Sequence, residues 1–166
     1  MAHPVIDCTG VEVREEHVDA LRSLLKEEPR AWDPFERAES EAEAIAYHVT
    51  LYAAFTVAVG RKFSPRYSFS QVIRFVADLR INLKKGAEKV HPRVAEEMIR
   101  EALGEPNLES IDLLDGETAI MAEVVVLLTL LDEAELDEAG LEEFIKDSVD
   151  FARGWVAARQ GESSGS

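Results

Sequence analysis

Apolar residues recur along most of this chain with the three- and four-residue spacing of an amphipathic α-helix. In the segment 11–27, Val13, His17, Leu21 and Leu24 lie on one face, which is the pattern of a helix packed against a core. The segments with this pattern are 11–27, 68–83, 92–103 and 138–159. The β-branched residues 124–126 lie inside an apolar run longer than a typical strand, so we expect no β-strand.

Two further segments are apolar on nearly every side and are predicted to be buried helices. They are 44–59 and 119–131, of 16 and 13 residues, whereas a helix that spans a bilayer needs about 20. Within them, the hydroxyls of Thr50, Thr56 and Thr129 are expected to bond to a carbonyl one turn back. The first ten residues lack the basic and apolar regions of a signal peptide. We therefore expect a soluble, cytoplasmic protein that does not enter a membrane.

Capping residues indicate where the helices begin and end. Asp33 and Pro34 are typical of a helix start and Gly60 of a helix end, so the second helix is predicted to run unbroken between them. Ser68 and Gln71 form a capping box at the start of the third helix. The last three helices are expected to begin at Pro92, Gly116 and Glu138.

These elements predict an all-α protein, a single-domain bundle of about six helices in which the second and fifth helices are central. The domain is expected to cover residues 1–160, and the Gly- and Ser-containing segment 161–166 to be a flexible tail. The single cysteine, Cys8, excludes an internal disulfide. Arginine outnumbers lysine by 12 to 6, which we interpret as a sign of a bacterial source.

The charged residues are distributed unevenly along the chain. Its 18 bases and 33 acids give a formal net charge of −15. Residues 61–100 nevertheless hold ten bases and four acids, a net charge of +6, which leaves −21 on the remainder. One interpretation is that this basic segment makes ordinary surface ion pairs with acidic helices of the same chain. The other is that it binds an acidic partner or the acidic face of a second copy.

Aromatic residues lie among the cations of this basic segment, at Phe63, Tyr67 and Phe69. Arginine and aromatic side chains are the types that anchor protein interfaces, so the segment is a candidate interface. Its predicted residues are Arg61, Lys62, Arg66, Tyr67, Arg74, Lys84, Lys85 and Lys89. Nucleic acid is an unfavourable partner, because the chain as a whole is strongly negative.

Motifs that would indicate an enzyme or a metal site are absent from the sequence. It contains no glycine-rich phosphate loop, G-x-S-x-G, H-E-x-x-H or C-x-x-C. Its single Glu-x-x-His pair, Glu88 and His91, directly precedes Pro92, and a di-iron bundle needs two such pairs on continuous helices. We therefore expect no catalytic residue, no metal and no cofactor. No segment resembles a named protein family.

Two polar residues within the apolar helices define a candidate ligand pocket. These are His48 and Glu123, and a buried carboxyl group must be paired, hydrogen-bonded or protonated. With Tyr52 and Phe55 they are predicted to line a small-molecule pocket between the central helices. The alternative interpretation is that Glu123 reaches solvent and that His48 is a hydrogen-bonded core residue.

Taken together, these features favour a non-catalytic helical protein with an interaction or regulatory role. It would use its acidic surface and its basic central segment to bind a protein partner or itself. The first alternative is a ligand-binding helical sensor with a pocket between its central helices. The second alternative is an enzyme of unrecognised type that uses the same pocket residues.

Overall fold

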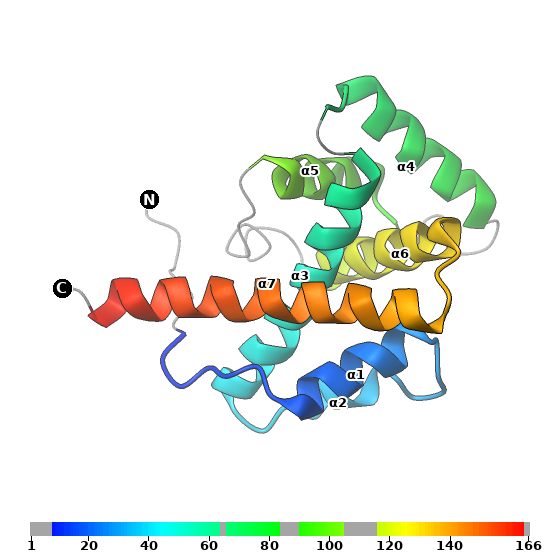
Figure 1. The fold of residues 1–166 in the computed structure, drawn as a ribbon. Helices are drawn as coiled ribbons and strands as arrows, with labels where there is room; N and C mark the ends of the chain where they lie inside the picture. The colour runs from blue at the N-terminus through cyan, green and yellow to red at the C-terminus, as the bar shows by residue number, and fades with distance from the viewer. Residues whose placement is uncertain (1–7, 64–65, 84–89, 105–115, 165–166) are drawn as a thin grey trace. The chain divides into compact units, whose positions relative to one another are not determined.

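The protein is helical in the part of the chain that its computed structural model describes, which comprises residues 8–63, 66–83, 90–104 and 116–164. This part contains seven helices and no strand (Figure 1), which confirms the prediction of an all-α protein. The helices are α1 (Glu15–Leu25), α2 (Asp33–Glu36), α3 (Glu41–Phe63), α4 (Phe69–Leu83), α5 (Pro92–Leu103), α6 (Gly116–Ala134) and α7 (Glu138–Ser164).

The described chain divides into two compact units. Residues 58–135 form the first, which we call the α4–α6 unit, and residues 8–57 with 136–164 form the second, the α1/α7 unit. Helix α3 contributes to both units, because the division falls between Val57 and Ala58. The expectation of a single domain over residues 1–160 stays a prediction.

The helix predicted to run unbroken from Asp33 is in fact two helices, α2 and α3, so the described chain has seven helices where about six were predicted. Ser40 starts the second of them: its Oγ accepts a hydrogen bond from the backbone N–H of Glu43 at 3.1 Å. The carboxylate of Glu43 in turn accepts one from the backbone N–H of Glu39 at 3.2 Å. The bond from Glu43 to Ser40 satisfies an amide group that a helix start leaves without a partner, and the bond from Glu39 fixes the residue before the cap, so a new helix begins here.

Other predicted helix starts are confirmed by the hydrogen bonds that cap them. Ser68 Oγ accepts from the backbone N–H of Gln71 at 3.2 Å, and Gln71 Oε1 accepts from the backbone N–H of Ser68 at 2.8 Å. Asp137 Oδ1 accepts from the backbone N–H of Gly140 at 2.7 Å, at the start of α7. Helix α5 has both of its predicted ends.

Three helices extend beyond their predicted ends. Helix α3 passes through Gly60 to Phe63, and α6 continues to Ala134. A glycine inside a helix lowers its stability by roughly 1 kcal/mol without breaking its hydrogen bonds, so Gly60 does not end α3. Helix α7 includes residues 161–164, the first part of the predicted tail, and the last two residues lie outside the described chain.

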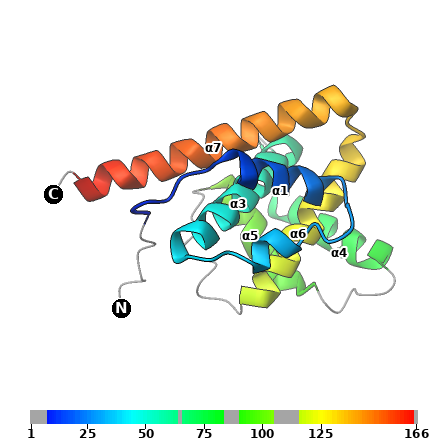
Figure 2. The same cartoon turned by 90° about the horizontal axis from the view of Figure 1, so that it is seen from below.

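The α4–α6 unit is organised around α5, which contacts both α4 and α6 (Figure 2). Fully buried side chains from all three helices form its core: Val72 and Val76 of α4, Ile99 of α5, and Val126 and Leu127 of α6. Full burial of a side chain of this size stabilises the folded state by about 1.5–3 kcal/mol. This core fixes the direction in which the remaining side chains of α4 point.

In the α1/α7 unit, polar side chains tie α7 to the N-terminal part of the chain. The guanidinium of Arg22 in α1 donates to both carboxylate oxygens of Glu142 in α7, at 2.7 and 3.0 Å. Arg153 and Gln160 of α7 donate to backbone carbonyl oxygens of the segment before α1. The accepting carbonyls are those of Cys8, Val11 and Val13.

Helix α3 is long and apolar enough to cross a membrane if length and composition alone are considered. However, 67% of its most apolar 18-residue window is buried inside the protein. The core helix of a soluble protein, which is mostly buried, passes the same test of length and composition.

Candidate interaction surface on helix α4

The apolar residues of α4 continue beyond the face that packs in the core. Val72, Phe75, Val76 and Leu79 are buried, as the spacing of an amphipathic helix predicts. Further apolar residues of the same helix lie outside this buried face, at Phe69, Ile73, Ala77 and Ile81, and all four are exposed. The helix therefore has more apolar surface than its own unit covers.

These four exposed residues, which we call the α4 row, are spaced at intervals of four positions. Residues at this interval form a continuous ridge along a helix. The exposed large hydrophobic side chains of the described residues are Tyr67 and three members of the row, Phe69, Ile73 and Ile81. Their exposed fractions range from 37% to 72%. Such clustering is characteristic of a binding surface rather than of scattered surface residues.

Arginine side chains lie on both sides of the α4 row. Arg74 directly follows Ile73 and Arg80 directly precedes Ile81, and neighbouring helix positions are about 100° apart, so the two arginines flank the row on opposite sides. Arg100 of α5 lies over the ring of Phe69, 4.5 Å from its centroid, in a cation–π contact. The row is thus an apolar surface with cationic edges.

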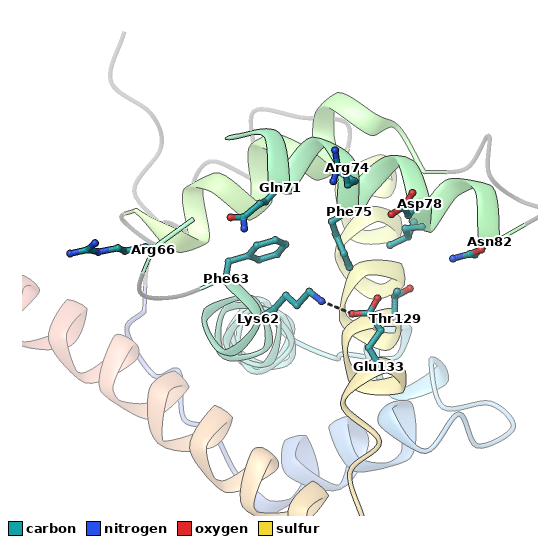
Figure 3. Close-up of a pocket in the computed structure, with 11 residues that line it drawn as sticks. Lys62, Phe63, Arg66, Gln71, Arg74, Phe75, Asp78, Asn82, Thr129 and Glu133 are labelled. Carbon is teal, nitrogen blue, oxygen red and sulfur yellow. Dashed lines mark ion pairs between the residues drawn. The ribbon is translucent and has the colours of Figure 1, made fainter. Parts of the chain in front are cut away.

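A cleft of about 460 Å³ lies on the other flank of α4, within the α4–α6 unit (Figure 3). It is formed by the end of α3, by α4 and by the second half of α6. Its lining residues are Lys62, Phe63, Arg66, Gln71, Arg74, Phe75, Asp78, Leu79, Asn82, Thr129 and Glu133. Its size is within the range of small-molecule pockets.

The cleft combines an aromatic pair with an ion pair. The rings of Phe63 and Phe75 meet edge to face, with centroids 5.6 Å apart. Beside them Lys62 Nζ lies 3.2 Å from Glu133 Oε2, and both side chains are about half exposed (Figure 3). This mixture suits a ligand or a peptide side chain that has both an apolar and a charged part.

The predicted interface residues that the structure describes all lie in the α4–α6 unit and are exposed. They are Arg61, Lys62, Arg66, Tyr67 and Arg74. Lys62, Arg66 and Arg74 line the cleft. The other three predicted residues, Lys84, Lys85 and Lys89, lie outside the described chain.

Sequence reasoning missed Ile73 and Ile81, which are central to the exposed surface. The available signal was the number of apolar residues in the segment 68–83, which exceeds what one buried face of a helix holds. The sequence alone does not distinguish an apolar residue covered by another element from one left in solvent.

The four residues of the predicted ligand pocket are divided between the two units. His48, Tyr52 and Phe55 belong to the α1/α7 unit, and Glu123 belongs to the α4–α6 unit. Phe55 is fully buried, Tyr52 lies beside it with ring centroids 6.1 Å apart, and His48 is half-buried. None of the four is among the residues that line the cleft described above.

Glu123 is buried in α6, with only 2% of its surface exposed, so the interpretation that it reaches solvent is wrong. Its Oε1 has no hydrogen-bond partner among the described residues. Burial raises the pKa of this carboxyl group from 4.5 to about 8, because the charged form loses its hydration. Glu123 is therefore protonated and uncharged at neutral pH.

His17 of α1 is a second buried titratable group, and it lies near the carboxylates of Glu16 and Glu43. It is 2% exposed, and its ring packs edge-on against Tyr47 with centroids 4.5 Å apart. Its Nδ1 accepts a hydrogen bond from the backbone N–H of Arg14 at 2.9 Å, which places the ring proton on Nε2.

The protonated Nε2 of His17 points toward Glu16 Oε1, at 3.9 Å, and has no hydrogen-bond partner among the described residues. A metal ion would need a lone pair on Nε2. While Nδ1 accepts the bond from Arg14, the ring proton occupies Nε2 and no lone pair is available there. The group is therefore a buried proton donor beside two carboxylates. The burial of His17 confirms the helical spacing that places it on the buried face of its helix.

No protein-family model, curated protein or solved structure matches this chain. The chemistry of the described surfaces is therefore the basis for a functional proposal.

Proposed function

We infer that this chain is a non-catalytic, cytoplasmic interaction protein that binds a protein partner, or a second copy of itself, through α4. The observation that carries this proposal is the α4 row: three large apolar side chains are exposed along one helix, between arginines. Apolar and arginine side chains in one patch are typical of the centre of a protein interface. Residues 61–100, which include α4, hold ten bases and four acids, and this local excess of cations would favour a partner with an acidic surface.

In-cell photo-crosslinking tests this proposal even though the partner is unidentified. Ile81→p-benzoylphenylalanine places a photoreactive group on the α4 row, and Lys146→p-benzoylphenylalanine places it on an exposed position of α7 as a control. We expect one defined adduct from position 81 and none of the same mass from position 146. Adding Arg74→Glu with Arg80→Glu should remove the adduct.

Failure to crosslink at position 81 would overturn the proposal, provided that the circular dichroism spectrum of the variant matches that of the natural chain. Equal adducts from positions 81 and 146 would also overturn it, since they would indicate contact without a preferred surface. Self-association appears in the same experiment as an adduct of twice the chain's mass.

The second candidate function is ligand binding, and the cleft beside α4 favours it. Its aromatic pair and its cations suit an organic anion with an aromatic body, for which anilinonaphthalene sulfonate is a suitable probe. We expect saturable fluorescence that Asn82→Trp abolishes by filling the cleft and that Ile81→Ser leaves unchanged. Loss with Ile81→Ser alone would assign the probe to the α4 row and overturn this second function.

We also propose that α3 and α6 are the central helices of a bundle that unfolds as one domain. This proposal is supported by their apolar composition and by fully buried residues such as Phe55 and Val126. Circular dichroism and tryptophan fluorescence should report the same urea midpoint. Two separate transitions would show that the two units are independent domains.

A further inference from the structure

We propose that the α4 row binds an acidic amphipathic helix of another protein, and this inference rests on the proposed interaction function. The partner helix would place an apolar stripe on the α4 row and carboxylates beside Arg74, Arg80 and Arg100. The spacing of the row, the charge at its edges and the shape at its centre each support a partner of this kind.

The spacing of the α4 row favours a helix as the partner. Ridges made of residues four positions apart pack into the grooves of a second helix in the commonest class of helix–helix contact. The row extends over 13 positions, or 12 steps, from Phe69 to Ile81, and a helix rises 1.5 Å per residue, so the row is about 18 Å long. A partner helix of three to four turns covers this length.

The centre of the row has the shape of a socket. Ala77 is exposed and lies between Ile73 and Ile81, so the ridge has a dip where the side chain is only a methyl group. A large apolar side chain of the partner can enter this dip between the two isoleucines. This arrangement is how one helix inserts a residue between those of another.

The charges at the edges of the row favour an acidic partner. Arg74 lies on one side of the row, and Arg80 and Arg100 lie beside its two ends. Asp78 is the one acidic residue of α4, and it follows Arg74 by four positions. Helix α5, which carries Arg100, also has Glu96, Glu97 and Glu101, but residues 61–100 as a whole hold ten bases and four acids. Carboxylates at matching positions of the partner would therefore be favoured over ammonium groups.

A second copy fits the same surface less well. In a symmetric dimer each patch meets its own copy, so the arginines of one row would lie near those of the other. A membrane with anionic lipids would also attract the arginines, but a flat lipid surface has no side chain of fixed position to enter the dip at Ala77. An acidic helix satisfies both the apolar row and its cationic edges.

Binding of designed peptides to the full chain tests this inference. The probe is a fluorescein-labelled peptide of about 18 residues, with leucines on one helical face and glutamates beside them. A second peptide keeps the leucines and has lysines instead of glutamates, and a third keeps the glutamates and has glutamines instead of leucines. Fluorescence anisotropy should show saturable binding of the first peptide only, with the other two weaker by about tenfold or more.

Matched variants then locate the binding site. Ala77→Gln fills the dip with a residue that favours helix and should weaken binding of the first peptide by about tenfold or more. Ala157→Gln makes the same change at an exposed position of α7 and should leave binding unchanged. Equal weakening of binding by both variants, or no weakening by either, would overturn the assignment of the binding site to the α4 row.

Other occupants of the row are outcomes of the same series. Light scattering should show a monomer at low salt, and a dimer that Ala77→Gln dissociates would overturn the acidic helix in favour of a second copy. Phosphatidylserine vesicles should not retain the chain, and retention that Ala77→Gln abolishes would overturn it in favour of a membrane. If no peptide binds but the crosslink at position 81 persists, the interaction function stands and this class of partner is wrong.

Discussion

The α4–α6 unit and the α1/α7 unit both bury apolar side chains, but they differ in what they leave exposed and in the buried titratable group that they hold. The first exposes the α4 row among arginines and buries a carboxyl group, Glu123. The second is tied together by polar side chains such as Arg22 and buries an imidazole, His17. The comparison indicates that the surface of one unit is suited to binding, whereas the polar contacts of the other serve its own fold.

The two buried titratable groups should give opposite dependences of stability on pH, because burial disfavours the charged form of each. For an acid this raises the pKa, and for a base it lowers the pKa. The pH profile of unfolding therefore separates the contributions of the two units, and substitutions in each unit test the comparison independently.

The largest expected effect is that of Glu123. The unfolded chain releases this proton near pH 4.5 and the folded chain near pH 8, so the folded state binds more protons within this window. Its contribution to the free energy of unfolding is fully present below pH 4.5 and falls as the pH rises, by up to about 5 kcal/mol at pH 8. Urea titrations between pH 5 and 8 measure this loss.

Glu123→Gln is the control for that prediction, because it keeps the shape of the protonated side chain without titrating. It should be more stable than the natural chain at pH 8 and should show a flatter pH profile. An unchanged profile would mean that another group is responsible for the dependence.

A second prediction compares two isoleucines of the α4–α6 unit that differ in exposure. Ile99 is fully buried, whereas Ile81 is 72% exposed. Ile99→Ala should lower the free energy of unfolding by about 2–5 kcal/mol, since it leaves a cavity. Ile81→Ala should change it by less than about 0.5 kcal/mol, while weakening binding of the acidic peptide. Similar destabilisation by both variants would show that the α4 row is covered within the chain.

A third prediction concerns His17 in the α1/α7 unit. Desolvation lowers its pKa below 6.5, although Glu16 and Glu43 act in the opposite direction. The unfolded chain therefore gains a proton near pH 6.5 that the folded chain does not accept. The stabilisation is fully present above this pH and is lost as the pH falls from 6.5 to the lower pKa of the folded state.

His17→Asn separates titration from hydrogen bonding, because its Oδ1 can accept the bond from Arg14 that Nδ1 now accepts. It should remove the loss of stability below pH 6.5. His17→Ala also removes the acceptor and leaves a cavity beside Tyr47, so at neutral pH it should cost more than the roughly 1 kcal/mol of a lost cap. The prediction is wrong if the free energy of unfolding of His17→Asn, measured by urea titration, still falls below pH 6.5 as it does in the natural chain.

The smallest expected effect is that of the exposed pair Arg22 and Glu142. Hydrogen bonding to Arg22 lowers the pKa of Glu142, but screening by water limits what this surface pair contributes. Glu142→Gln should shift the urea midpoint slightly at low salt and not at all at high salt. A large shift at both salt concentrations would show that the pair is essential to the packing of α1 on α7.

Much of the secondary structure could be predicted because its signals are local. The capping box of Ser68 and Gln71, the start of α5 at Pro92 and the cap at Asp137 all act within one turn of the chain. The break between α2 and α3 has an equally local signal in Ser40 and Glu43, but Asp33 and Pro34 supply a competing start a few residues earlier.

The candidate site was only partly predictable. The excess of cations in residues 61–100 could be predicted from the charges, and the exposed position of Arg74 from helical periodicity. The expected bond of Thr50 to a carbonyl one turn back is confirmed, since its Oγ1 lies 2.7 Å from the oxygen of Ala46. The same expectation for Thr56 is wrong, because its hydroxyl has no partner among the described residues.

The sequence by itself determined that this protein is helical, where most helices begin, and how its charge is divided along the chain. Helical hydrogen bonds and caps join residues at most a few positions apart, so the local sequence is enough to specify them. Only the tertiary structure decided that Glu123 is buried and that Ile73 and Ile81 are exposed. Exposure depends on side chains from remote segments that pack over a residue, and helical periodicity does not record which face they cover.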